Sequence, residues 1–159
     1  MRAPYQVLIF PFIKEEDKYY YAIFKREDLS IWQGLAGGGE AEEIPLEAAK
    51  REAYEEAAID KNLRYIRLSS MTTIPATNIH GFLWGDVVMI PEFSFGVEVP
   101  SKELKISGEH VQYLWLSCND AIDKLRYDSN KSALWELSYR LENGLDGIKE
   151  NIQAIKKFF

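Results

Sequence analysis

The chain has 159 residues, of which 47% are apolar and 13% aromatic, so it can bury the core of one domain and is not disordered as its main state. Nineteen lysines and arginines stand against 25 aspartates and glutamates, and the net charge of −6 argues against nucleic acid or an anionic membrane as a partner. The single cysteine, Cys118, excludes an intrachain disulfide. No apolar stretch reaches the roughly 18 residues of a membrane span, and we expect a cytoplasmic protein.

The first elements in chain order are two neighbouring strands, over 5–13 and 19–25, because both segments are rich in aromatic and β-branched residues and a charged turn separates them. A helix is predicted over 45–58 from its alanine and glutamate content. Further strands are predicted over 64–72, 81–90 and 110–116, and helices over 119–126 and 129–141. This order indicates an α/β or α+β domain with helices packed on a sheet.

Acidic side chains and glycines concentrate in and before the helix over 45–58. The run Gly37 to Gly39 predicts a loop with positive φ, whose backbone can approach a ligand closely. Glu52, Glu55 and Glu56 stand at positions i, i+3 and i+4 and therefore share one helix face. Like charges at this spacing destabilise a helix unless a cation binds them, and Mg²⁺ takes carboxylates together with substrate phosphates. We therefore expect a Mg²⁺ site, with Mn²⁺ as an alternative ion.

A longer spacing pattern runs from the glycines through this helix and resembles the Nudix box, the signature of the Nudix hydrolase family. It departs from the family at Ala58, where glycine is usual, and at Ala53, which is smaller than the usual aliphatic residue. Ile44 also stands where the family often has a hydroxyl-bearing helix cap. The residues that carry the match are Gly37, Glu43, Arg51, Glu52, Glu55 and Glu56.

Within this family, about residues 4–141 are similar to the dihydroneopterin triphosphate pyrophosphohydrolase group, also described as dATP pyrophosphohydrolase-like. The flanking segments that support this are Trp32-Gln33-Gly34, Glu109-His110, Trp115-Leu116 and Ser129-Asn130-Lys131. The resemblance implies the Nudix fold, an α/β/α sandwich with a mixed sheet between helices.

The resemblance also implies roles for individual residues. The implied metal ligands, one of which acts as the general base, are Glu52, Glu55, Glu56 and Glu109. Gly37, Glu43 and Arg51 are expected to support the site without taking part in the chemistry. Substrate contacts are proposed for Arg26, Trp32 and His80, although Arg26 and His80 also fit plain surface positions and Trp32 also fits the core.

The implied activity is metal-dependent hydrolysis of a phosphoanhydride in a pterin or purine nucleoside triphosphate, which releases pyrophosphate and the monophosphate. One alternative is a hydrolase of ADP-ribose or of a dinucleoside polyphosphate, which Pro75 weakly favours. Another is a module that senses a nucleotide without cleaving it. The complete set of glutamates in the box argues against the sensing module.

The last residues extend beyond the resemblance, so we divide the chain into a hydrolase domain over 1–143 and an extension over 144–159. Apolar residues recur there at helical spacing, which predicts an additional amphipathic C-terminal helix. It is expected to pack on the same domain or on a second copy in a homodimer. The residues that define the spacing are Ile148, Ile152, Ile155 and Phe159.

Overall fold

A mixed sheet forms the centre of the structure, a computed structural model that describes residues 1–79 and 84–147. Within these residues, seven strands are arranged in the order β3-β2-β1-β6-β5, with β4 paired to β1 and β7 paired to β2. The strands are β1 (Arg2–Glu15), β2 (Lys18–Arg26), β3 (Trp32–Gln33), β4 (Leu35–Glu40), β5 (Tyr65–Pro75), β6 (Met89–Glu98) and β7 (His110–Leu116). The α-helices are α1 (Pro45–Ala57), α2 (Cys118–Lys124) and α3 (Asp128–Glu142), and a short 3₁₀ turn η1 spans Ala76–Asn78.

Strand β1 runs through the middle of the sheet and contributes side chains to the cores on both of its faces. It pairs in antiparallel fashion with β2 and β4 and in parallel with β6. Its side chains alternate between two buried clusters, with Val7 and Ile9 on the α1 face and Leu8, Phe10 and Phe12 on the α3 face. A strand covered on both faces is apolar at consecutive positions, as β1 is here.

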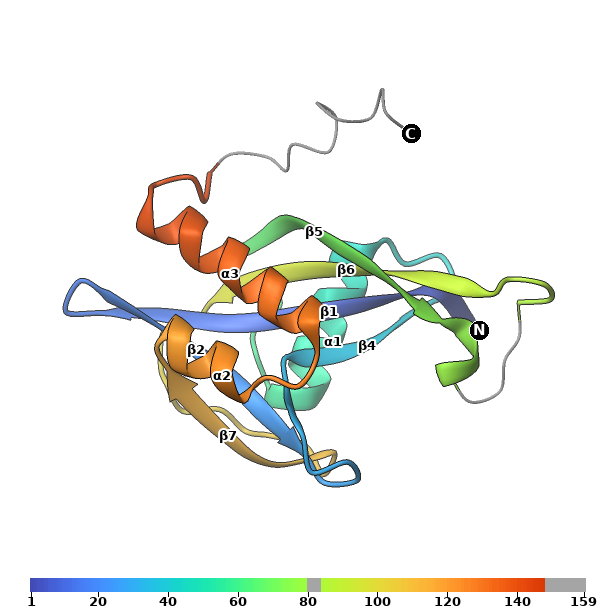
Figure 1. Cartoon of the computed structure of the whole chain (residues 1–159), viewed down its shortest axis with the longest axis horizontal. Coiled ribbons are helices and arrows are strands. Elements are labelled where there is room, and N and C mark those ends of the chain that lie inside the picture. Colours follow the sequence, from blue (N-terminus) through green and yellow to red (C-terminus); the bar gives the residue numbers. More distant parts are fainter. Residues whose placement is uncertain (80–83, 148–159) are drawn as a thin grey trace.

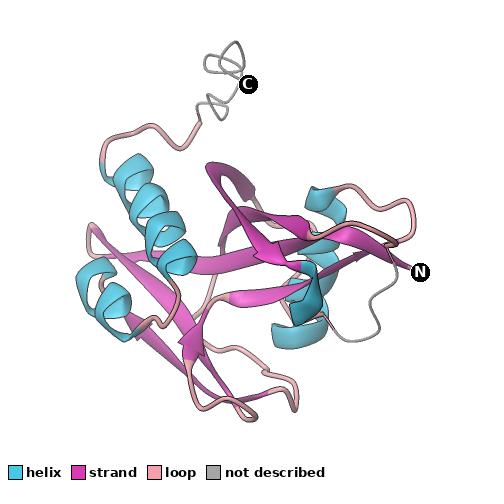
Figure 2. Cartoon of the chain, turned by 45° about the vertical axis from the view of Figure 1, so that its right-hand side comes forward, coloured by secondary structure: helices cyan, strands magenta, loops and turns pink. Residues whose placement is uncertain are grey.

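The helices cover opposite faces of the sheet. Figure 1 shows α2 and α3 in front of the strands and α1 behind them, and Figure 2 shows the same separation after a turn of the view. Four alanines of α1 are buried, and their small side chains let this helix lie close to the sheet. The mixed sheet between helices that the sequence predicted is therefore confirmed.

Two expectations about local structure are wrong. The strand predicted over 81–90 begins at Met89 and continues to Glu98, and residues 84–88 are not in a strand. Pro91 had marked the end of that strand, but it pairs with Thr73 on β5 just before the parallel pairing with β1 begins at Glu92. Because β6 has only one neighbouring strand at Pro91, the missing backbone N–H of proline does not interrupt hydrogen bonding to a second strand.

The glycine run is the second difference, since it forms part of β4 and is not a loop. The glycines with positive φ in the described residues are Gly85 and Gly144, not Gly37 to Gly39. Residues 80–83, which include the first residues of the wrongly predicted strand, and 148–159, where the additional helix was expected, lie outside the described residues. None of the described helices is long and apolar enough to cross a membrane.

Candidate active site

The helix α1 carries most of the acidic site, and both of its ends carry residues that are unusual at helix caps. Ile44 at the N-terminal cap has no side-chain acceptor, although Glu47 Oε1 accepts the Ile44 backbone N–H at 3.0 Å. At the other end Ala58 adopts a left-handed conformation with φ 55°. The backbone N–H groups of Ala58 and Ile59 donate to Tyr54 and Ala53, so this end has a regular left-handed cap in which alanine stands in place of the usual glycine.

The glycines of β4 allow side chains from two directions to lie directly on the strand. A Cβ atom at Gly37 would overlap the carboxylate of Glu52, and one at Gly38 would overlap the guanidinium of Arg2. The backbone of these glycines requires no unusual φ. Glycine is needed here for close approach, so the sequence expectation of a ligand-facing loop with positive φ is corrected on this point.

Arg51 connects α1 to the strand and to the segment between them. Its Nε and Nη2 atoms donate to the two carboxylate oxygens of Glu43 at 2.8 and 2.9 Å, and Nη2 also donates to the Gly38 carbonyl at 2.7 Å. Its Nη1 atom donates to Glu52 at 2.9 Å and to Glu55 at 3.2 Å. Hydrogen bonds from Arg51 lower the pKa of Glu43. Arg51 thus fixes the position of the helix and of its first acidic side chains.

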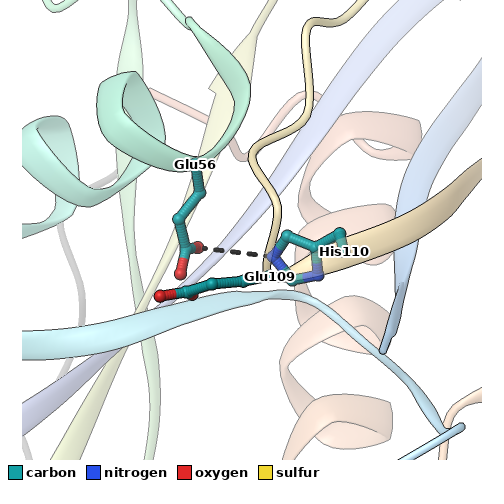
Figure 3. A group of neighbouring side chains, drawn as sticks. All are labelled: Glu56, Glu109 and His110. Carbon is teal, nitrogen blue, oxygen red and sulfur yellow. Dashed lines mark ion pairs between the residues drawn. The ribbon is translucent and has the colours of Figure 1, made fainter. Parts of the chain in front are cut away.

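Glu56, Glu109 and His110 form the acidic centre next to the end of α1 (Figure 3). One potential ligand atom from each of these residues lies within 4.8 Å of the other two. The Ser107 backbone N–H donates to the Glu56 carbonyl at 2.8 Å, which ties the segment before β7 to the helix. Glu109 is more than fifty residues away from Glu56 in the chain, so its position beside α1 depends on tertiary contacts such as this one.

Burial opposes the charged forms of Glu56, Glu52 and His110. Burial, together with a hydrogen bond from the protonated Glu56 carboxyl to Glu109 and repulsion by Glu52, raises the pKa of Glu56 to about 9. Burial also raises the pKa of Glu52 against the opposing effect of Arg51, and it lowers the pKa of His110. The 3.7 Å contact between His110 Nε2 and Glu56 Oε2, dashed in Figure 3, is therefore not a charged pair at neutral pH.

Unpartnered atoms indicate what this centre can hold. Among the described residues, Glu56 Oε2 and both ring nitrogens of His110 are buried without a hydrogen-bond partner. Buried polar atoms are normally partnered, and several carboxyl groups held close together favour a cation that cancels their repulsion. The carboxylates of Glu56 and Glu109 in this group offer oxygen ligands that fit a hard divalent cation such as Mg²⁺.

Two adjoining cavities open beside the acidic centre. The first, about 520 Å³, is lined by Glu109, Gly37 and Arg2 among others. The second, about 510 Å³, extends over the α3 face of the sheet and includes Asn130 and Glu92. Gln6, Arg26, Ala36, Asn78 and Ile79 line both cavities, so the two adjoin each other.

The remaining residues proposed from the sequence lie in different surroundings. The Glu55 side chain is 56% exposed and contacts Arg51 at 3.2 Å, and it is not part of the close group of Glu56, Glu109 and His110. Arg26 lines both cavities but is bound to Asp28 at 2.6 Å. Trp32 packs against the core cluster on the α3 face and is not among the residues that line either cavity. His80 lies outside the described residues.

Sequence reasoning missed three side chains at this site. His110 was named only as part of the flanking Glu109-His110 match and given no role at the site, although its position directly after Glu109 was a usable signal. Arg2 supplies a cation at the first cavity, where its Nη2 atom donates to Gln6 at 2.7 Å. Glu92 is buried at the second cavity. Neither Arg2 nor Glu92 belongs to a spacing pattern, so only the fold reveals them.

Known proteins resemble this chain in both sequence and structure. A Listeria monocytogenes chain assigned to the NUDIX hydrolases is 39% identical, with a TM-score of 0.82 over 90% of this chain and 97% of that one. The dihydroneopterin triphosphate pyrophosphohydrolase of E. coli is 22% identical, with a TM-score of 0.72 over 87% of this chain and 97% of that one.

A curated relative and a family match extend this comparison. A dihydroneopterin triphosphate diphosphatase of Haemophilus influenzae is 23% identical over 121 residues, which cover 74% of this chain and 77% of that protein. Residues 6–135 match the family described as the NUDIX domain. This match spans most of the described structure, including α1, Arg51 and the acidic centre, and the chain therefore belongs to the NUDIX domain family.

Proposed function

We propose that this chain hydrolyses a pterin or purine nucleoside triphosphate to the monophosphate and pyrophosphate in the presence of a divalent cation. The observation that carries the proposal is the acidic centre with its unpartnered Glu56 and His110 atoms, whose Glu109 lines the first of two adjoining cavities. The first cavity has room for phosphates beside the carboxylates, and the second has room for a ring system.

The proposed reaction is attack by water on the α-phosphorus. The new bond joins the water oxygen to this phosphorus, and the bond between the α-phosphorus and the bridging oxygen breaks. That oxygen leaves with the electron pair as part of pyrophosphate, and a carboxylate accepts the proton of the water. When a divalent cation is bound, it neutralises the phosphate charge near the carboxylates and stabilises the charge of the transition state.

The chain's own residues divide this work by position. Glu52, Glu56 and Glu109 are the side chains that would hold the cation, with Glu55 at the outer edge. Arg51 keeps Glu52 and Glu55 in place through direct hydrogen bonds. Arg2 and Arg26 line the first cavity and offer positive charge to phosphate oxygens in an otherwise acidic site. The general base is the carboxylate that remains free of the cation.

Similarity supports the choice of a triphosphate substrate. The Haemophilus influenzae and E. coli proteins described above carry the name of an enzyme acting on dihydroneopterin triphosphate. Both are distant relatives at 23% and 22% identity, so they guide the choice of substrates to test. A panel should contain dihydroneopterin triphosphate, dATP, GTP, ADP-ribose and a dinucleoside polyphosphate.

The test is an assay that measures phosphate and pyrophosphate separately in the presence of Mg²⁺. We expect pyrophosphate from one or more triphosphates and little release of free phosphate. Faster cleavage of ADP-ribose or of a dinucleoside polyphosphate would replace the proposed substrate class. Absence of turnover on the whole panel, with Mg²⁺ or Mn²⁺, would contradict hydrolysis and leave the nucleotide-sensing module as the alternative.

The Glu56→Gln variant tests the acidic centre directly. Glutamine keeps the size of the side chain but cannot carry charge, so turnover should fall by about 10²-fold or more while the fold is retained. Calorimetry should show weakened Mg²⁺ binding in the same variant. Glu42→Gln removes the same charge at an exposed position before α1 and should leave both measurements unchanged. Equal Mg²⁺ binding by wild type and Glu56→Gln would exclude Glu56 as a ligand.

A further inference from the structure

The second cavity contains a carboxyl group that the proposed hydrolysis does not use. This cavity lies over the α3 face of the sheet and is bordered by β1, β6 and the first turn of α3. Its shared lining residues place it next to the first cavity, which Glu109 of the acidic centre also lines. A triphosphate whose phosphates reach Glu109 would therefore extend its ring into the second cavity.

Glu92 lies in the middle of β6, where an apolar residue would normally stand. It pairs with Gln6 on β1 and with Thr72 on β5, so β6 has a neighbouring strand along both of its edges at this position. Glu92 is only 7% exposed and faces the second cavity. It shares a sheet face with Gly96, whose Cα approaches Leu137 of α3.

No partner within the described residues compensates for the burial of this carboxyl group. Its carboxylate oxygens make no hydrogen bond or ion pair with residues 1–79 or 84–147. Burial is the cause that raises the pKa of Glu92 to about 7. Nearby polar groups are already engaged, since Asn130 Oδ1 accepts the Gly34 N–H at 2.8 Å and Gln6 accepts from Arg2. A largely buried carboxyl group that borders a cavity and has no protein partner there points to a ligand that hydrogen-bonds to it.

A carboxylate has two acceptor oxygens and therefore binds best to a ring edge that presents two hydrogen-bond donors. Its two oxygens accept two parallel hydrogen bonds, as in carboxylate pairs with arginine. A 2-amino-4-oxo ring, present in both guanine and pterin, offers a ring N–H beside an amino N–H and so presents two adjacent donors. Adenine presents one donor beside one acceptor, which leaves one carboxylate oxygen facing a lone pair.

We propose that Glu92 determines ring specificity by accepting two N–H bonds from a 2-amino-4-oxo ring, so that the enzyme prefers guanine or pterin triphosphates to adenine triphosphates. This inference rests on the proposed function for the position of the phosphates. It assigns a role in substrate specificity to a residue outside the Nudix-box pattern. It also restricts the purine or pterin substrates to those whose ring presents two adjacent N–H donors.

The test compares GTP, dihydroneopterin triphosphate, ITP and ATP as substrates of the wild type and of Glu92→Gln. ITP keeps the ring N–H of GTP but lacks the amino group, so the wild type should show a kcat/KM for GTP that is about 10-fold or more above that for ITP. Glutamine offers one acceptor and one donor and therefore matches adenine. In Glu92→Gln the ratio of GTP to ITP should approach one, and the ratio of ATP to GTP should rise.

A matched control lies on the same strand. Glu98→Gln removes a carboxylate at the exposed end of β6, outside both cavities, and should keep the wild-type substrate ratios. Comparison of GTP with dihydroneopterin triphosphate then shows which 2-amino-4-oxo ring fits better. Identical ratios for wild type and Glu92→Gln would overturn the role of Glu92, although turnover itself would still support the proposed hydrolysis.

Binding of the products separates failure of this inference from failure of the proposed function. Calorimetry with GMP, IMP and AMP requires no turnover and uses the same two proteins. Tighter binding of GMP than of IMP by the wild type, lost in Glu92→Gln, supports the inference even in a protein without hydrolase activity. Equal binding of the three monophosphates by the wild type overturns it without any variant, so a folding defect in Glu92→Gln does not affect the result.

Discussion

Arg51 has nitrogens 2.8 to 3.9 Å from carboxylate oxygens of Glu40, Glu43, Glu52 and Glu55. Its side chain is only 16% exposed, so solvent screens these contacts less than it screens a surface pair. The guanidinium holds Glu43 through both oxygens and also reaches the Gly38 carbonyl. Such a geometry depends on the planar fork of arginine and not only on its charge.

Replacement of Arg51 therefore tests whether shape or charge is important. Arg51→Ala leaves partly buried carboxylates unpaired and should lower the free energy of unfolding by about 2–4 kcal/mol. Arg51→Lys keeps the charge but cannot make the paired contacts, so it should recover only part of this loss. Urea denaturation measures both effects, and Arg126→Ala at an exposed position serves as the control. Wild-type stability of Arg51→Lys would show that charge is sufficient.

The buried carboxyl of Glu92 should make stability depend on pH. Its pKa is about 7 in the folded chain and 4.5 as the ordinary value, so the folded state binds the proton more strongly. The resulting stability is complete below pH 4.5 and is lost as the pH rises through 7, by about 3 kcal/mol in total.

Glu92→Gln removes this titration, so the difference in unfolding free energy between wild type and variant should change by that amount between pH 4.5 and pH 7. The measurement is urea denaturation over this range with a metal chelator present. Titration of Glu56 is common to both proteins and cancels in the difference. A difference that stays constant with pH would show that Glu92 is not desolvated in solution.

At the scale of elements, α1 is the part of the chain where sequence and structure correspond most directly. Its acidic residues and alanines follow helical spacing, so both the helix and the grouping of Glu52 with Glu56 could be predicted. β4 could not be predicted, because Gly37 and its neighbours lack strand propensity and pair with β1 only in the folded chain.

The same distinction applies to the site. Glu109 was inferred through family resemblance, whereas Arg2 and Glu92 reach the cavities from strands whose sequence contains no recognisable motif. Glu55 shows a second limit of sequence spacing. It shares a helix face with Glu56, but Glu55 is exposed and Glu56 is buried, so the spacing does not predict which glutamate is buried. Local spacing therefore predicts an element and its acidic face, and tertiary contacts determine which side chains meet.

The C-terminal end of α1 offers a test of the departure from the family pattern. Ala58 has φ 55°, a conformation that disfavours any side chain and suits glycine. Ala58→Gly should therefore raise the free energy of unfolding by about 1 kcal/mol. Ala57→Gly, one residue earlier within the helix, is the matched control and should lower it by about 1 kcal/mol or more. Destabilisation by both substitutions would contradict the left-handed conformation at Ala58.

The N-terminal end of α1 can be tested in the same way. Ile44 is 56% exposed at the cap position and contributes little buried apolar surface. Ile44→Ser supplies a hydroxyl acceptor for a free backbone N–H and should raise the free energy of unfolding by about 1 kcal/mol. Ile44→Ala is the control, because it removes the apolar side chain without adding an acceptor. Equal stability of the two variants would show that the hydroxyl makes no cap.

At the scale of the whole molecule, the sheet separates two cores that meet only through its strands. One cluster packs α1 on the face that carries the acidic site, and the other packs α2 and α3 on the opposite face. The central strand β1 contributes to both clusters, and Gly96 of β6 admits the side chain of Leu137 from α3. The fit between sheet and α3 therefore depends on the absence of a side chain at one position.

Gly96→Ala tests this fit without touching the acidic centre. The added Cβ would lie 2.6 Å from Leu137 Cδ1, too close for unstrained packing, and should lower the free energy of unfolding by about 1–3 kcal/mol. Thermal denaturation should show a decrease of about 2–4 °C per kcal/mol. Mg²⁺ binding measured well below the transition should be retained, because α1 and Glu109 do not contact this position.

The double variant Gly96→Ala/Leu137→Ala identifies the cause. Leu137→Ala opens a cavity and should itself lower the free energy of unfolding by about 2–5 kcal/mol. In that background the methyl group that Gly96→Ala adds enters free space, so this substitution should have little effect or should stabilise the protein. The two substitutions are then strongly non-additive. Additive losses would mean that Gly96 is required for the backbone of β6 itself, and that α3 packs on the sheet independently of this contact.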